Sequence, residues 1–313
     1  WITHPDVAAD EAAVLHFRRE LVLDSVPESF VVRVSADNRY RLFVNGRSVS
    51  VGPARSDVLH WRYERVELAP YLVAGPNVIT ATVWNWGDAR PMAQISHRTG
   101  FLIEGESSNA LDTGSNWQVL RDLSRTFAMP DSQALGGYYV AAPGETYVAA
   151  ADPQGREGGA WVAAVNVGGN PQARAISRGA DPYGNAGDWQ MVASELPPME
   201  ETPQRFAAIR RASGVATEPG VPNGTRNMLI PANTTASILL DQGELTNAYP
   251  VLTASGGAGA RMMLTYAESL YDAEGNKGDR NAVDGKTIRG VTDTIVFDGG
   301  TERQFSPLWW RTF

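Results

Sequence analysis

The stretch RYRLFVNGRSVSVG, residues 39–52, decides the fold class. Every second residue from Tyr40 to Val44 is apolar, and these side chains share one face of an extended strand because side chains alternate along a strand. Asn45 and Gly46 follow at once, and Asn-Gly between two alternating runs is the strongest short-range signal of a β-hairpin. The stretch therefore predicts two antiparallel strands joined by a two-residue turn.

The same strand chemistry continues on both sides of this hairpin. Short runs rich in β-branched and aromatic residues, separated by turn-forming residues, occupy 14–23, 30–35, 63–68, 77–86, 99–106 and 116–122. No long helical period occurs before residue 195. Residues 1–195 therefore predict an N-terminal jelly-roll-like β-sandwich with long loops, which fall mainly in the Gly- and Ala-rich part 125–195.

The C-terminal part of the chain predicts a second β-domain. The Pro-Pro pair in ELPPMEETPQRF favours extended backbone, so residues 196–226 are predicted to form a Pro-rich linker. Residues 227–313 contain apolar strands broken by a Gly-rich turn. Phe313 falls within a predicted strand, so we expect this second sandwich to be incomplete at its C-terminal end and the segment to belong to a longer protein. The whole chain is predicted to be all-β.

Composition excludes several classes of function. Lys and Arg number 27 and Asp and Glu number 35, so the net charge is −8, which disfavours nucleic acid and membrane surfaces as partners. The absence of cysteine excludes disulfides, thiolate zinc sites and cysteine nucleophiles. The four histidines lack the spacing of a zinc site. The chain starts with Trp1, and a processed N-terminus would favour a periplasmic or secreted location over a cytoplasmic one.

Long ordered strings in the chain resemble those of bacterial α-L-rhamnosidases. They include SADNRYRLFVNGRSVSVGPARSD, then LDQGELTNAYPVLTASGGAGARMMLTYAESLYDAEGNKGDRN, and finally FSPLWWRTF. The resemblance is strongest over 14–105 and 227–313 and weakest over 125–195. It implies a modular glycoside hydrolase that removes terminal non-reducing α-L-rhamnose by inversion, with two carboxyl groups in an (α/α)6 catalytic barrel that follows a jelly-roll domain and a concanavalin-like domain.

This resemblance also implies what the chain lacks. Residues 1–313 contain no series of long amphipathic helices from which the (α/α)6 barrel could be built, so we expect the catalytic pair to lie beyond Phe313. The chain would then be the non-catalytic, inactive N-terminal part of a rhamnosidase, which supports or borders the catalytic domain and meets rhamnosylated glycosides through it. A free-standing carbohydrate-binding or scaffold module is the alternative.

Aromatic and polar residues of two loop regions are candidates for sugar or interdomain contacts. Indole rings stack on sugar faces, while Arg and Asp hydrogen-bond hydroxyl groups. The candidates are Trp86, His60, Trp61, Arg62, Asp88 and Arg90. The alternative is that the tryptophans belong to the core and the charged residues pair with one another. Asp37 and Asn38 predict a plain turn rather than a calcium-linked sugar site.

The carboxylate-rich loop AESLYDAEGNKGDRNAVDGK, residues 267–286, has three alternative interpretations. Catalysis by paired carboxyl groups is disfavoured because basic neighbours stabilise ionised carboxylates. The calcium loop of an EF-hand is excluded because Lys277 stands where glycine is required. An irregular calcium site is an alternative without a motif, so no metal or cofactor is assigned. An ordered hairpin loop is the favoured interpretation.

Overall fold

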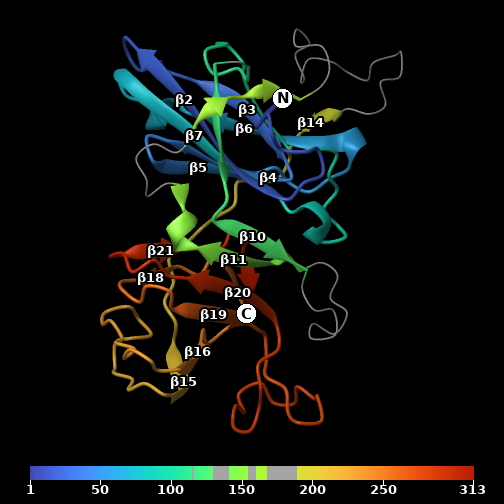
Figure 1. Ribbon diagram of the computed structural model, residues 1–313. Helices are drawn as coiled ribbons and strands as arrows, with labels where there is room; N and C mark the ends of the chain where they lie inside the picture. The colour runs from blue at the N-terminus through green and yellow to red at the C-terminus, as the bar shows by residue number, and fades with distance from the viewer. Residues whose placement is uncertain (115, 130–140, 154–159, 168–188) are drawn as a thin grey trace. The chain divides into compact units, whose positions relative to one another are not determined.

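The computed structural model describes residues 1–313 except 115, 130–140, 154–159 and 168–188. Within these residues the chain is all-β, with several open sheets and no α-helix, which confirms the predicted fold class. No helix in the described part is long and apolar enough to span a membrane. The chain divides into two compact units, one formed by 1–129 and 151–199 and the other by 130–150 and 200–313 (Figure 1).

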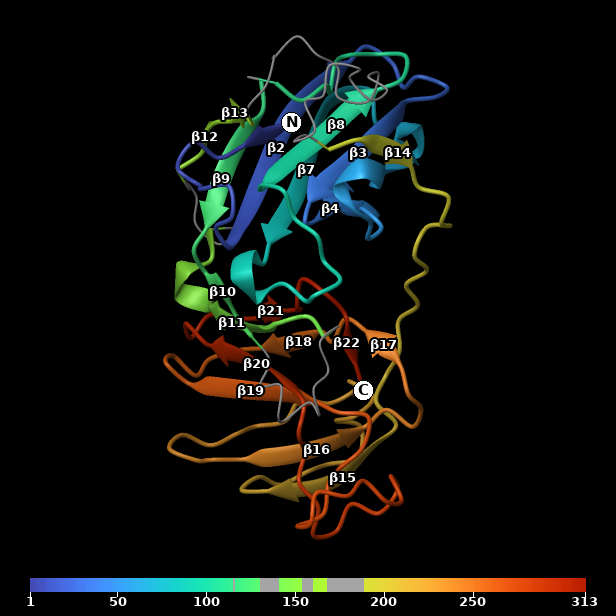
Figure 2. The ribbon, with the colours of Figure 1, turned by 90° about the vertical axis from the view of Figure 1, so that its right-hand side faces the viewer.

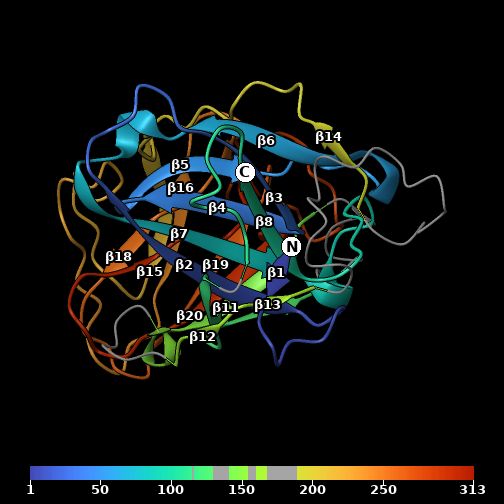
Figure 3. The same cartoon turned by 90° about the horizontal axis from the view of Figure 1, so that it is seen from above.

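The first unit contains two six-stranded sheets (Figures 2 and 3). The first sheet contains, in spatial order, β13 (Val165–Asn166), β1 (Ile2–Thr3), β8 (Gly100–Gly105), β3 (Val31–Asp37), β6 (Trp61–Glu67) and β14 (Met191–Ala193). The second sheet contains β12 (Val162–Ala163), β9 (Gln118–Asp122), β2 (Ala13–Leu23), β7 (Gly75–Asn85), β4 (Arg39–Val44) and β5 (Arg47–Gly52). Figure 3 shows β2, β7 and β4 lying side by side in the second sheet.

The hairpin predicted from residues 39–52 is confirmed. β4 and β5 pair antiparallel, with Val44 opposite Arg47, so only Asn45 and Gly46 form the turn. Both turn residues have positive φ, at 51° and 78°, as a two-residue turn of this hand requires. The Asn45 side chain also accepts a hydrogen bond from the backbone N–H of Val78 at 2.9 Å, which fixes the turn to β7.

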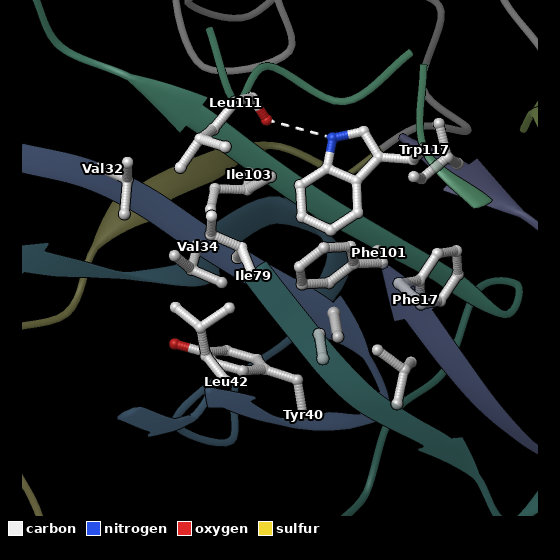
Figure 4. Packing of buried hydrophobic residues seen from close by; sticks show 14 of the residues in the cluster. Phe17, Val32, Val34, Tyr40, Leu42, Ile79, Phe101, Ile103, Leu111 and Trp117 are labelled. Atoms are coloured by element: carbon white, nitrogen blue, oxygen red, sulfur yellow. Dashed lines mark hydrogen bonds between the residues drawn. The ribbon is translucent and has the colours of Figure 1, made fainter. Parts of the chain in front are cut away.

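The core of the first unit lies between its two sheets. Alternate residues of facing strands supply it, among them Val32 and Val34 of β3, Leu42 of β4 and Ile79 of β7 (Figure 4). Trp117 fills one end of this core, and its indole N–H donates to the Leu111 carbonyl at 3.2 Å. Burial of these faces is what holds the sandwich together, since apolar burial is the main favourable term in folding.

Short elements connect the strands. In the described ranges the 3₁₀ turns are η1 (Val58–His60), η2 (Ala69–Tyr71), η3 (Gly87–Ala89) and η4 (Ala149–Ala151), and a further strand, β10, spans Arg125–Ala128. Asp57 caps η1 by accepting a hydrogen bond from the Leu59 N–H at 2.8 Å.

The second unit is built from smaller pieces of sheet. β11 (Gly144–Val148) pairs parallel with β20 (Val291–Val296), and β20 pairs antiparallel with β19 (Arg261–Tyr266). Three further antiparallel pairs join β15 (Ala208–Ser213) to β16 (Ser237–Asp241), β17 (Asn247–Ala248) to β22 (Arg311–Thr312), and β18 (Leu252–Ala254) to β21 (Arg303–Phe305). β15 lies inside the range 196–226 that the sequence predicts as a linker. The domain boundaries at 195 and 227 stay predictions.

Candidate functional site

A group of polar and aromatic side chains gathers at one end of the first sheet. β3 ends at Asp37, β8 begins at Gly100 and β6 begins at Trp61, and β3 lies between the other two strands. Because the three strands are antiparallel neighbours, these ends meet. Asp37, Asn38, Trp61, His97 and Trp189 are named here the Asp37 cluster.

The Asp37 carboxylate is fully buried and accepts five hydrogen bonds. One oxygen, Oδ1, accepts from the Asn38 amide at 2.7 Å and from the Ser96 hydroxyl at 2.8 Å. The other, Oδ2, accepts from the backbone N–H groups of His97 at 2.6 Å and Arg98 at 3.1 Å. The fifth donor is the indole N–H of Trp189, at 3.1 Å from Oδ2. The carboxylate therefore ties the end of β3 to the segment before β8 and to the segment before β14.

Burial raises the pKa of the Asp37 carboxyl, and the hydrogen bonds from His97, Ser96, Asn38 and Trp189 oppose that rise. Both oxygens are already occupied by protein donors, and the side chain has no exposed surface. Such a carboxylate cannot serve as the general acid or base for an outside substrate, because it has no access to the proton to be transferred. Its role is to position the groups around it.

The ring of Trp189, whose indole N–H donates to this carboxylate, contacts three further aromatic rings. The ring of Trp189 stacks on that of Trp1 with centroids 4.0 Å apart, and it meets Trp61 and His97 edge-on at 6.3 Å and 5.0 Å. A Cβ atom at Gly100 would lie 3.2 Å from the ring of Trp1, closer than ordinary van der Waals contact, so the glycine leaves room for the stack. Indole and imidazole rings beside a carboxylate and an amide are the groups that proteins use to bind sugar rings and their hydroxyls.

Several buried donors near Asp37 have no hydrogen-bond partner among the described residues. They are the indole N–H of Trp61, the Nε of Arg98 and the hydroxyl of Thr99. Arg98 and Thr99 precede β8, and Trp61 begins β6, so all three belong to the same end of the first sheet. Buried donors of this kind are satisfied by water or by the oxygen atoms of a ligand.

The structure separates the residues that the sequence predicts as sugar or interdomain contacts. Trp61 joins the Asp37 cluster and is only 2% exposed. His60 is exposed and its ring lies 3.1 Å from the Asp57 carboxylate. Arg62 is half-buried and donates to the Ala193 carbonyl at 2.9 Å, which fixes β14 to β6.

The other three predicted contact residues lie on the loop that follows β7. Trp86 is 2% exposed, and its backbone N–H donates to the Asn38 side chain at 3.0 Å. Asp88 is exposed, and Arg90 is half-buried and donates to the Gly87 carbonyl at 2.8 Å. A sugar contact by any of the six residues stays a prediction.

The sequence does not indicate the central role of Asp37 and Asn38. Both are fully buried, and Asn38 is the single residue between β3 and β4, so the pair does not form the plain surface turn that their residue types favour. One sequence feature does indicate where Asp37 points. The period-two pattern of β3 places it on the face opposite the core residue Ala36. Nothing in the local sequence indicates that Trp189 covers that face.

The carboxylate-rich loop is ordered largely by hydrogen bonds to its backbone. Tyr271 and Thr287 form an isolated bridge that closes the loop. Within it, the Lys286 ammonium donates to the carbonyls of Lys277 and Asp279, both at 2.7 Å. No group of three or more acidic, histidine or cysteine side chains suited to a metal occurs in the described part of the chain. These contacts agree with an ordered hairpin loop.

Comparison with known proteins gives structural relatives only. The chain matches no family model and no curated protein. It is similar to the solved structure of a glycoside hydrolase family 78 rhamnosidase of Bacillus sp. GL1, with 15% identity and a TM-score of 0.54, covering 100% of this chain and 33% of that one. It is similar to α-L-rhamnosidase from Aspergillus terreus, with 14% identity and a TM-score of 0.58, covering 98% and 32%.

A third similar structure is the α-L-rhamnosidase of Streptomyces avermitilis complexed with L-rhamnose, with 22% identity, a TM-score of 0.54 and coverage of 96% of this chain and 26% of that one. The chain thus spans about a third or less of the length of the solved proteins it matches. At these identities the match establishes the fold. The chain therefore has, over nearly its whole length, the fold of a β-sheet region of α-L-rhamnosidases.

Proposed function

We propose that this chain is the non-catalytic, N-terminal β-sandwich region of an inverting α-L-rhamnosidase, a glycoside hydrolase that releases terminal α-L-rhamnose. The observation that carries the proposal is the match of 96–100% of this chain to only about a third or less of several rhamnosidases. The described residues contain no helical barrel, and the fully buried carboxylate of Asp37 is saturated by protein donors. Both features favour a supporting role.

Activity measurements test this proposal. The product of the complete gene is expected to hydrolyse an aryl α-L-rhamnoside, and the 1–313 polypeptide is expected to have no activity above the buffer rate. Rhamnoside hydrolysis by 1–313 alone would overturn the non-catalytic assignment. A complete, folded product without rhamnosidase activity would overturn the enzymatic one.

A second candidate function is sugar binding by the first unit. The observation that favours it is the Asp37 cluster, where rings of Trp1, Trp189 and His97 adjoin buried donors without partners. The chemistry fits a neutral monosaccharide, which offers a ring face to the indoles and hydroxyl oxygens to the donors.

Calorimetry of the 1–313 chain with L-rhamnose, and with D-glucose as the control sugar, tests this second function. Binding is expected to be abolished by Trp1→Ala and weakened by Trp189→Phe, which keeps a ring but removes the indole donor. Absence of heat with every sugar, together with unchanged tryptophan fluorescence, would leave only the supporting role.

A further inference from the structure

The second unit buries few of the apolar side chains that its strands carry. Among the described residues of this unit, Tyr147, Ala149, Ile295 and Phe305 form a buried cluster, and Ala142, Leu270 and Trp309 are buried as well. These are far fewer than the buried apolar residues between the sheets of the first unit. No residue of β15, β16, β18 or β19 is fully buried. Strands with apolar residues on one face are stable only when that face is covered.

The strand β19 is the clearest case. It pairs with β20 through an unbroken antiparallel register from Arg261 to Tyr266, and no strand of the described chain pairs with its other edge. Met262 and Leu264 lie on the face that carries Ile295, and both pack against the buried cluster while staying partly exposed. Met263 points to the opposite face and is 64% exposed.

This edge lacks most of the features by which proteins protect free strand edges. β19 contains no proline, no lysine and no bulge, and its one charged residue is the exposed Arg261 at its first position. The edge strand β5 of the first unit also begins with an exposed arginine, Arg47, but its pairing with β4 contains an irregularity after Leu42, which the pairing of β19 with β20 lacks. A regular edge whose central residues are apolar is a site at which another strand adds.

A neighbouring element has an open edge as well. β16 pairs only with β15, and a two-stranded ribbon is at best marginally stable in water. Figures 1 and 2 show this ribbon on the side of β19 that faces away from β20, yet no hydrogen-bonded ladder joins β16 to β19. Leu240 of β16 is 40% exposed, so this ribbon too presents apolar surface without a cover.

We propose that the free edge of β19 accepts a β-strand from a further region of the same parent polypeptide, and that this strand completes the sheet of the second unit. The proposal rests on the proposed function, because the rhamnosidases that the chain matches are about three times as long and so provide such a region. The side chains of the incoming strand would alternate between the two faces of the sheet. Those beside Met262 and Leu264 would be apolar, whereas those beside Met263 could be of any type. A second copy that pairs its own β19 with this edge is the alternative occupant, and the exchange experiment separates the two.

Hydrogen exchange measured by mass spectrometry tests this proposal. Amides of β19 are expected to exchange at least about tenfold more slowly in the product of the complete gene than in the 1–313 chain, while β7, central in the first unit, exchanges equally in both. Equal exchange of β19 in the two proteins would overturn the proposal. So would protection that appears in 1–313 alone and rises with its concentration together with a doubled mass, because that result assigns the edge to a second copy.

A lysine substitution provides an independent test, because a lysine on an edge strand opposes the addition of another strand. Met263→Lys is expected to lower the melting temperature of the complete product and to leave that of 1–313 unchanged. Val22→Lys is the matched control, since Val22 is 72% exposed on β2 of the first unit and is expected to change neither protein. Identical behaviour of the two variants in the complete product would contradict the proposal.

The outcomes separate this inference from the proposed function. A complete product that hydrolyses rhamnosides but leaves β19 unprotected refutes the strand addition and keeps the function. A complete product that protects β19 but releases no rhamnose keeps the strand addition and refutes the function.

Discussion

At the scale of single residues, Asp37 holds together more of the first unit's buried polar groups than any single contact described above. Its carboxylate satisfies five donors that would otherwise be buried without an acceptor. Asp37→Asn replaces one oxygen by an amide that faces those donors, so we expect unfolding in urea to require roughly 2–4 kcal/mol less free energy than in the unmodified chain. Asp24→Asn, at an exposed turn position, is the control and should leave the midpoint unchanged. A shift for Asp37→Asn as small as that of the control would contradict the positioning role.

A second residue-scale prediction concerns the buried pair His16 and Asp122. The His16 Nε2 lies 3.1 Å from Asp122 Oδ2, and the Ser124 N–H donates to Oδ1 at 2.7 Å. Burial raises the pKa of Asp122, but the hydrogen bonds from His16 and Ser124 together lower it by more than burial raises it. The folded-state pKa therefore lies below the ordinary value of 3.8. A lowered folded pKa means that ionised Asp122 stabilises the fold above about pH 3.8, and that this contribution is lost as pH falls through the folded pKa.

The matching measurement is the difference in unfolding free energy between the unmodified chain and Asp122→Asn as a function of pH. The difference should shrink as pH falls below about 3.8, where the unmodified chain also loses its carboxylate. A difference that grows in acid would show that the sign of the pKa shift is wrong.

At the scale of elements, the β4–β5 turn offers the sharpest test. Gly46 has a φ of +78°, and an added Cβ meets no atom within 4 Å, so only the backbone conformation disfavours alanine. Gly46→Ala is therefore expected to destabilise the first unit by about 1 kcal/mol in chemical denaturation. Gly114→Ala is matched to it, because that Cβ also enters open space but the backbone needs no left-handed φ. Equal effects of the two substitutions would argue against the turn geometry.

The elements also show how far the sequence predicts the structure. Local signals suffice for the strands and for the hairpin at Asn45, because alternation and turn chemistry are properties of neighbouring residues. They do not suffice for β14, which pairs parallel with β6 from a segment about 130 positions later. The candidate site is not predicted for the same reason. Aspartate is a residue type that favours turns, and the indole that joins Asp37 to a buried cluster belongs to Trp189, 152 positions away.

At the scale of the whole molecule, the two units differ in how much apolar surface they bury. The first unit encloses a large core between two six-stranded sheets, whereas the described part of the second has a small buried cluster, and its strands β15, β16, β18 and β19 carry no buried residue. We therefore expect the 1–313 chain to bind a dye specific for exposed apolar surface through its second unit, and we expect the dye signal to fall by several-fold in the complete product. Equal dye binding by the two proteins would indicate that no partner region covers the second unit.

We propose that this fold belongs to the non-catalytic part of an α-L-rhamnosidase. The most direct measurement is rhamnose release from an aryl α-L-rhamnoside, followed by NMR so that the first-formed anomer is seen, with 1–313 and the complete gene product assayed side by side. We expect release of the inverted β-anomer by the complete product and none by 1–313. Failure of the complete, folded product to release rhamnose, or release by 1–313 itself, would contradict it.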